Sequence, residues 1–115
     1  GGPEKARQRH HERNKLLAKE PKERPNITTS LLNALLTPLE DLPTDASADA
    51  VKNVLMPLAD AQEAQGKGGR GAVLWPLRYA LSGQERSPDP FTLISILGSH
   101  EAISRIRKAI AILGK

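Results

Sequence analysis

A chain of 115 residues with a net charge of +4 at pH 7 fits one domain, or one domain with a tail. The absence of cysteine excludes disulfides, thiol catalysis and thiolate metal sites, and it suits a reducing compartment. No apolar run approaches the ~20 residues of a membrane-spanning helix, and the start has no signal-peptide pattern. We therefore expect a cytoplasmic protein with no membrane contact.

The charges are unevenly distributed along the chain. Residues 1–24 carry eight Lys/Arg and four Glu, residues 25–65 carry one Lys and six acids, and residues 66–115 carry eight Lys/Arg and three acids. A basic C-terminal half indicates a polyanionic partner.

The first 24 residues predict a basic arm. Leu16 and Leu17 are its only large apolar side chains, and a helix with so little to bury is frayed. We expect residues 1–24 to be flexible or marginally helical, with Gly1-Gly2 a cloning remnant, and residues 25–115 to form a helical domain.

The segment NITTSLLNALLTPLEDL predicts the first helix of that domain. Asn26 or Thr28 is the expected N-cap, and Pro38 kinks or ends the helix because it lacks an N–H group. Its apolar stripe consists of Leu31, Leu32, Leu35, Leu36 and Leu39.

The segment PTDASADAVKNVLMPLADAQEAQ predicts a second helix, capped near Thr44, Asp45 or Ser47 and bent or broken at Pro57. Its inner face consists of Val51, Val54, Leu55 and Leu58. The following GKGGRG, residues 66–71, predicts a flexible basic linker without the spacing of a phosphate-binding loop.

Three helices are expected after the linker. VLWPLRYAL predicts a short helix with Pro76 in its first turn and Gly83 as a left-handed C-cap. Asp89 caps the helix PFTLISIL, which has Pro90 at its first position. Gly98 ends it and Ser99 caps the last helix, whose apolar face consists of Ile103, Ile106, Ile110 and Leu113. No stretch alternates with period two, so the predicted fold is all-α, a small bundle of about five helices.

The order of three short motifs resembles a known family. PLRYALSG, SPDPF and ILGSHEAISRIRKAI follow one another as in the C-terminal anticodon-binding domain of bacterial-type glutamyl-tRNA synthetases, which are class I aminoacyl-tRNA synthetases. The resemblance covers about residues 28–113, and its specific part is residues 74–113. It implies a helical domain that binds the anticodon loop of a glutamate tRNA. It also implies a parent glutamate–tRNA ligase that uses ATP and magnesium.

The resemblance also implies site residues. The family's anticodon contacts fall on Arg78, Ser87, Pro88 and Pro90; at the last position the family more often has leucine. A planar guanidinium can stack on an unpaired base and donate two hydrogen bonds to it, and prolines stiffen the turn and leave its carbonyls and an apolar surface free. Candidate phosphate contacts are Lys67, Arg70, Arg86, Arg105 and Lys108.

Plainer structural roles compete with these assignments. An arginine at position 78 can simply cover Leu74 or Leu81 with its stem, and the SPDP turn can be only a helix cap. For Trp75, we favour core packing over a stacking platform shared with Tyr79.

The sequence contains no catalytic set. It has no Ser-His-Asp or Cys-His arrangement and no class I ATP-binding signature, and the adjacent His10 and His11 would point about 100° apart on a helix, a poor metal pair. We expect a monomeric, non-catalytic RNA-binding fragment without a cofactor or bound DNA. One alternative is a helical protein-interaction module that uses the leucines of residues 31–42. Another is a helix-turn-helix DNA-binding domain built from PFTLISILGSHEAISRIRKAI.

Overall fold

The computed structural model describes residues 2–23, 25–64 and 69–114, and for residues 62–64 and 69–70 it describes the backbone alone. Six helices lie within these residues: α1 (Pro3–Leu16), α2 (Ile27–Glu40), α3 (Ala48–Ala64), α4 (Gly69–Ser82), α5 (Pro90–Leu97) and α6 (Ser99–Leu113). The described residues contain no strand, which confirms the all-α prediction. The five expected helices are α2 to α6, and α1 is a sixth.

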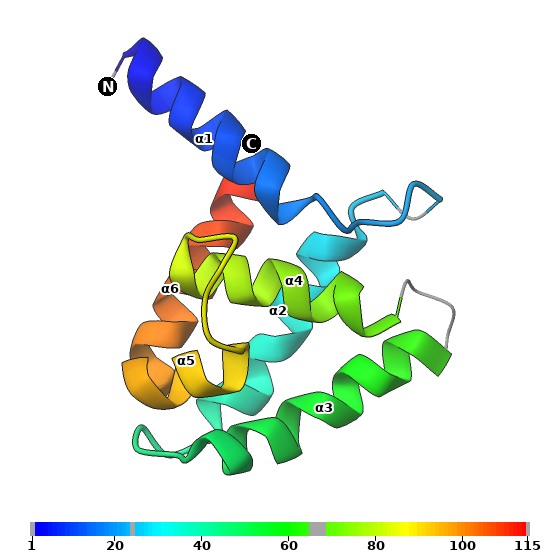
Figure 1. Ribbon diagram of the computed structural model, residues 1–115, viewed down its shortest axis with the longest axis vertical. Coiled ribbons are helices and arrows are strands. Elements are labelled where there is room, and N and C mark those ends of the chain that lie inside the picture. Colours follow the sequence, from blue (N-terminus) through cyan, green and yellow to red (C-terminus); the bar gives the residue numbers. More distant parts are fainter. Residues whose placement is uncertain (1, 24, 65–68, 115) are drawn as a thin grey trace.

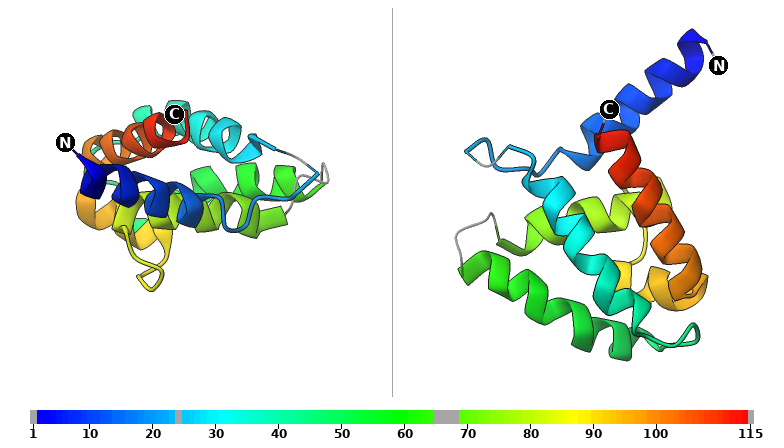
Figure 2. Two further views of the ribbon diagram at one scale, coloured as in Figure 1. Left: turned by 90° about the horizontal axis from the view of Figure 1, so that it is seen from above. Right: turned by 180° about the vertical axis from the view of Figure 1, so that it is seen from behind.

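The helices form two layers around a leucine-rich core. Seen from above in Figure 2, α2 and α6 lie in one layer and α1 and α4 in the other. α4 contacts every other helix, and α1 crosses the end of α4 and α6 (Figure 1). This central position of α4 matters because the candidate site residue Arg78 lies on it.

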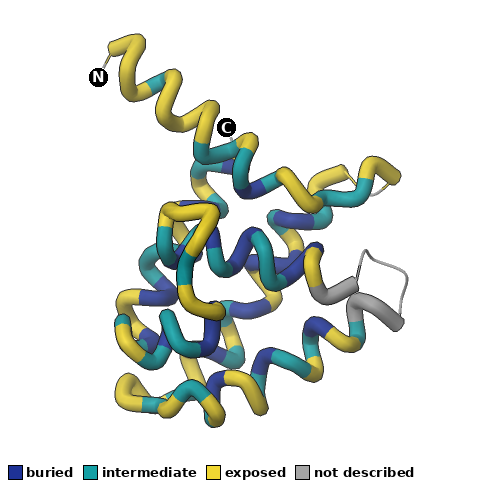
Figure 3. Tube along the Cα trace, in the orientation of Figure 1, coloured by how far each residue is buried: buried dark blue, intermediate teal, exposed yellow. Residues whose placement is uncertain are grey.

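Burial follows the predicted apolar stripes. The buried stripe residues are Leu31, Leu32, Leu35 and Leu39 of α2, Val51 and Leu55 of α3, and Ile103, Ile106 and Leu113 of α6. Figure 3 shows the buried segments of these helices and the exposed first turns of α1. Among the described residues, no helix is both long and apolar enough to cross a lipid bilayer.

Three prolines lie inside helices, and one of them corrects the sequence prediction. α2 and α3 run on past Pro38 and Pro57. Pro76 was expected in the first turn of a short helix, which is wrong because α4 begins at Gly69 and has Pro76 in its interior. A proline inside a helix costs roughly 3 kcal/mol. Pro76 is buried, and the packing of α4 against the other helices outweighs this local preference.

The helix ends agree in part with the expected caps. The Asp89 carboxylate accepts from the Thr92 N–H at 2.9 Å, the Ser47 hydroxyl accepts from the Ala50 N–H at 3.1 Å, and Gly83 and Gly98 have φ of 69° and 86°. These four predictions are confirmed.

Of two other expected caps, Ser99 is wrong, and Asn26 has the predicted position without the expected side-chain bond. Ser99 is a buried residue inside α6, and Gly98 holds the N-cap position without a side chain. Asn26 is the N-cap of α2, but its side chain makes no capping bond. Instead the Glu20 carboxylate accepts from the Thr28 N–H at 3.0 Å, since a negative charge is favourable at a helix N-terminus.

Residues 3–16 are helical, and the end of this helix joins the rest of the molecule. Leu16 is 2% exposed and belongs to the common core, whereas the first turns of α1 are exposed. The division into an arm at residues 1–24 and a domain at residues 25–115 stays a prediction. The predicted linker at residues 66–71 lies partly outside the described residues, and Gly71 belongs to α4.

Candidate nucleic-acid interface

Arg78 links α4 to the loop that follows it. We call this loop, residues 83–89, the corner; it protrudes from the layer that contains α4 (Figure 2). The half-buried Arg78 side chain donates from Nη2 to the Glu85 carbonyl at 3.1 Å, and from Nη1 to the Ser87 carbonyl at a longer 3.5 Å. Arg78 therefore lies at the corner, as the resemblance implies. However, two carbonyls expected to be free accept hydrogen bonds from it.

Trp75 lies one helical turn before Arg78 and contacts the same guanidinium. The Arg78 Cζ is 5.4 Å from the centroid of the Trp75 ring, and the Lys19 Nζ is 5.6 Å from it. Both distances allow cation–π attraction. The indole Nε1 donates to the Lys15 carbonyl at 2.7 Å. Trp75 is half-buried and held by the end of α1, so core packing accounts for only part of its surroundings. Tyr79 is buried and does not share a platform with it.

The two candidate prolines, Pro88 in the corner and Pro90 directly after it, differ in exposure. Pro88 is exposed, whereas Pro90 is buried at the first position of α5. The prediction that Pro90 contributes a free apolar surface is therefore wrong. Its burial follows from its place in the first turn of α5, which packs on α3, α4 and α6. Ser87 is half-buried, and its hydroxyl donates to the Pro88 carbonyl at 3.0 Å. Pro90 still reaches the site, because a cavity of about 240 Å³ is lined by Leu74, Trp75, Arg78, Asp89 and Pro90.

Asp89 fixes the end of the corner. The Thr92 N–H, and also the Thr92 hydroxyl at 2.8 Å, donate to its carboxylate. The first of these bonds is the main cause that lowers the pKa of Asp89 below its ordinary value. The carboxylate therefore stays ionised and keeps α5 capped beside the cavity.

Among the candidate phosphate contacts with a described side chain, Arg86 lies in the corner, whereas Arg105 and Lys108 lie on α6. Arg86 is exposed in the corner, close to Arg78. Arg105 donates to the Leu81 carbonyl at 2.6 Å and to Glu101, so its guanidinium is tied to the end of α4. Lys108 is exposed on α6. Lys67 and the side chain of Arg70 lie outside what the structure describes.

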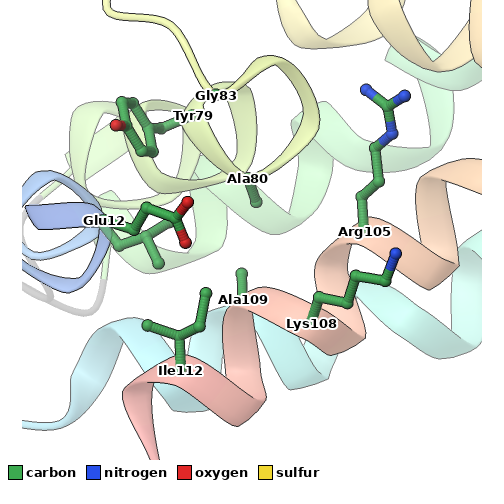
Figure 4. Close-up of a pocket in the computed structure, with 9 residues that line it drawn as sticks. Glu12, Tyr79, Ala80, Gly83, Arg105, Lys108, Ala109 and Ile112 are labelled. Atoms are coloured by element: carbon green, nitrogen blue, oxygen red, sulfur yellow. The ribbon is translucent and has the colours of Figure 1, made fainter. Parts of the chain in front are cut away.

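A second cavity lies between α1, α4 and α6. Its volume is about 210 Å³, and Figure 4 shows Glu12 and Tyr79 on one side of it and Arg105 and Lys108 on the other. Burial and, to a lesser degree, the charge of Glu12 raise the pKa of Tyr79, so its hydroxyl stays neutral. In the described part of the chain, no group of three or more His, Cys, Asp or Glu side chains is arranged to hold a metal ion.

Sequence reasoning missed three residues of this region: Lys15, Lys19 and Glu85. The Lys15 ammonium forms an ion pair with the Glu85 carboxylate, although 70 positions separate them. No spacing pattern connects residues so far apart. The contact between Trp75 and Arg78 was detectable, because residues three apart share a helix face.

Comparison with known proteins identifies the family. The family model described as "Anticodon binding domain" matches residues 8–110. The glutamate–tRNA ligase of Clostridium novyi is 37% identical over 90 residues, which cover 73% of this chain and 18% of that protein. The glutamate–tRNA ligase of Clostridium acetobutylicum is 34% identical over 98 residues, covering 84% of this chain and 19% of that protein.

A third relative, glutamate–tRNA ligase 1 of Methylorubrum extorquens, is 40% identical over 76 residues, covering 66% of this chain and 15% of that protein. The chain thus spans less than one fifth of the length of these relatives. No solved structure shows a significant match. With nearly all of its length matched by one family model, the chain belongs to the anticodon binding domain family.

Proposed function

We propose that this domain binds the anticodon loop of a glutamate tRNA as the C-terminal part of a cytoplasmic glutamate–tRNA ligase. Catalysis, with its ATP and magnesium, would belong to other parts of that enzyme, and the domain would act as a monomer. The observation that carries the proposal is the cavity shared by Trp75, Arg78 and Pro90 at the corner. The relatives that match the chain are themselves named as glutamate–tRNA ligases.

The chemistry of this cavity suits an unpaired base. Single-stranded loops are recognised by splaying bases onto aromatic rings or guanidinium planes and by hydrogen bonds to their edges. The Trp75 ring and the Arg78 guanidinium lie together at the cavity. A guanidinium has more N–H groups than the two corner carbonyls take up, so donors remain for a base edge.

The corner is also held by several local constraints before any ligand arrives. Pro88 and Pro90 fix their backbone φ, and Asp89 caps the next helix. The hydrogen bonds from Arg78 hold the corner against α4. A preassembled site loses less conformational entropy on binding than a mobile loop does.

The proposal is tested by titrating the domain with the anticodon stem-loop of a glutamate tRNA. Trp75 is the only tryptophan, so its fluorescence reports directly on the site. We expect saturable binding that Arg78→Ala weakens by about 1–3 kcal/mol, the range found for bidentate base contacts. Lys52→Ala is the matched control, because Lys52 is exposed on α3, at the other end of the molecule from α1 (Figure 1).

A stem-loop with a scrambled anticodon and a DNA duplex complete the experiment. Equal affinity for both loop sequences, or for wild type and Arg78→Ala, would contradict anticodon recognition. Tighter binding of duplex DNA would revive the helix-turn-helix alternative. Little favours that alternative, because α6 buries Ser99, Ala102 and Ile103 in its first turns. The protein-interaction alternative relied on leucines of α2 that are mostly buried in the core.

A further inference from the structure

A groove lies between α1 and the corner, next to the cavity of Trp75 and Arg78. Its volume is about 480 Å³, and its lining includes His11 and Lys15 from α1 and Gln84, Glu85 and Arg86 from the corner. Its walls come from segments about 70 positions apart in the sequence. We call it the arm groove.

The arm groove and the cavity have no lining residue in common, but hydrogen bonds join the residues of one to the residues of the other. The Glu85 carbonyl accepts from Arg78, while the Glu85 carboxylate pairs with the Lys15 ammonium. The Lys15 carbonyl in turn accepts from the Trp75 indole. The arm groove is therefore a neighbour of the cavity, within reach of the backbone of a nucleotide strand that has a base at Trp75 and Arg78.

The charges of the arm groove suit a phosphodiester. Lys15 and Arg86 are cationic, and among the described residues that line the groove Glu85 is the only acidic one. Glu85 is 54% exposed at its side chain and Lys15 33%, so their ion pair lies at the surface. Exposed ion pairs contribute little to stability, so another anion can replace Glu85 with little loss. A compact ammonium on a flexible stem is a common phosphate ligand.

We propose that the arm groove binds a backbone phosphate of the RNA whose bases occupy the cavity, and that this phosphate displaces Glu85 from Lys15. The Glu85 carboxylate then competes with the RNA phosphate for the Lys15 ammonium, and its side chain turns toward solvent when RNA binds. This inference rests on the proposed function and adds a second contact, on α1, that is independent of the base sequence.

Substitutions on the two sides of the ion pair give opposite results under this proposal. Lys15→Gln removes the phosphate ligand and should weaken binding of a labelled anticodon stem-loop roughly fivefold. Its salt dependence should fall by about 0.7 in the slope of log affinity against log salt, the value for one phosphate contact of a single strand. Glu85→Gln removes the competitor and should strengthen binding. Lys15→Arg keeps the charge and should stay near wild type.

A purely structural ion pair gives a different pattern. If Lys15 and Glu85 only hold α1 against the corner, both glutamine variants break the same contact and weaken binding together, and the inference is overturned. Arg86→Gln tests the groove without touching the ion pair, and we expect it to weaken binding and reduce the salt slope as well. Lys52→Gln on α3 is the control and should change neither quantity.

The matched and scrambled stem-loops separate this inference from the proposed function. A phosphate carries no sequence information, so Lys15→Gln should lower the affinity for both loops by the same factor. If Arg78→Ala removes anticodon-dependent binding while Lys15→Gln keeps wild-type affinity and salt slope, the proposed function stands and the arm groove is rejected. A wild-type domain that binds neither loop rejects both.

Discussion

The indole nitrogen of Trp75 donates a hydrogen bond to the backbone carbonyl of Lys15, 60 positions earlier in the chain. This bond ties the end of α1 to the middle of α4, at the edge of the cavity that holds Arg78. One side chain thus contributes both to the position of α1 and to the shape of the candidate RNA site.

Trp75→Phe keeps an aromatic ring and removes this hydrogen bond. We expect the free energy of unfolding to fall by about 1 kcal/mol, the usual net value of one hydrogen bond. Hydrogen exchange should accelerate for the amides of α1 more than for those of α2. Denaturant unfolding followed by circular dichroism and exchange measured by NMR check the two effects, and α1 amides with unchanged protection would contradict the prediction.

Arg78→Lys tests whether the forked shape of the guanidinium matters beyond its charge. An ammonium cannot donate to the Glu85 and Ser87 carbonyls in the same planar arrangement or stack on the Trp75 ring as a guanidinium does. We expect lower affinity for the anticodon stem-loop, by roughly tenfold, and faster exchange in residues 83–89. If Arg78→Lys keeps the wild-type affinity for the stem-loop and the wild-type exchange protection of residues 83–89, the positive charge alone suffices.

Asp89→Ala should destabilise the domain by about 1 kcal/mol at pH 7, because the N-cap of α5 is lost. The folded-state pKa of Asp89 is lowered from its ordinary 3.8, so its contribution is complete above that value and declines as the pH falls through the folded-state pKa. The difference in unfolding free energy between wild type and Asp89→Ala should therefore shrink in acid. Chemical denaturation of both proteins at pH 7 and near pH 3 measures it, and a difference that grows in acid would have the wrong sign.

Two glycine substitutions should change the stability of the domain in opposite directions. Gly98 has a φ of 86°, and a Cβ there would lie 3.3 Å from the Thr44 carbonyl oxygen, so Gly98→Ala should cost about 1–3 kcal/mol. Gly71 lies in α4 with open space around its Cβ position, so Gly71→Ala should stabilise the domain by up to about 1 kcal/mol. Thermal unfolding of the two variants beside wild type checks both signs, and equal shifts would contradict the backbone explanation.

Local signals in the sequence predicted much of the bundle. Asp89 followed by Pro90 marks the start of α5, and Gly83 and Gly98 mark helix ends, because each signal acts within a few residues. The interior position of Pro76 was not predictable in this way. Its cost is local, but the packing that outweighs it comes from helices elsewhere in the chain.

In the candidate site, too, contacts between neighbouring motifs were predictable and contacts between distant segments were not. The position of Arg78 beside Ser87 followed from a family resemblance over neighbouring motifs. The ion pair between Lys15 and Glu85 did not, because it depends on how α1 crosses α4 in three dimensions. Contacts between segments so distant along the chain leave no periodic signal in one sequence.

The pairing of α2 with α6 has a consequence for synthesis on the ribosome. The leucine face of α2 packs on the last of the described helices, and Arg107 of α6 reaches back to Glu40 at the end of α2. A nascent chain therefore exposes the part of this apolar surface that α3 and α4 do not cover until about seventy further residues have left the exit tunnel. We expect chaperone protection during that interval to raise the fraction of the protein that reaches its native form.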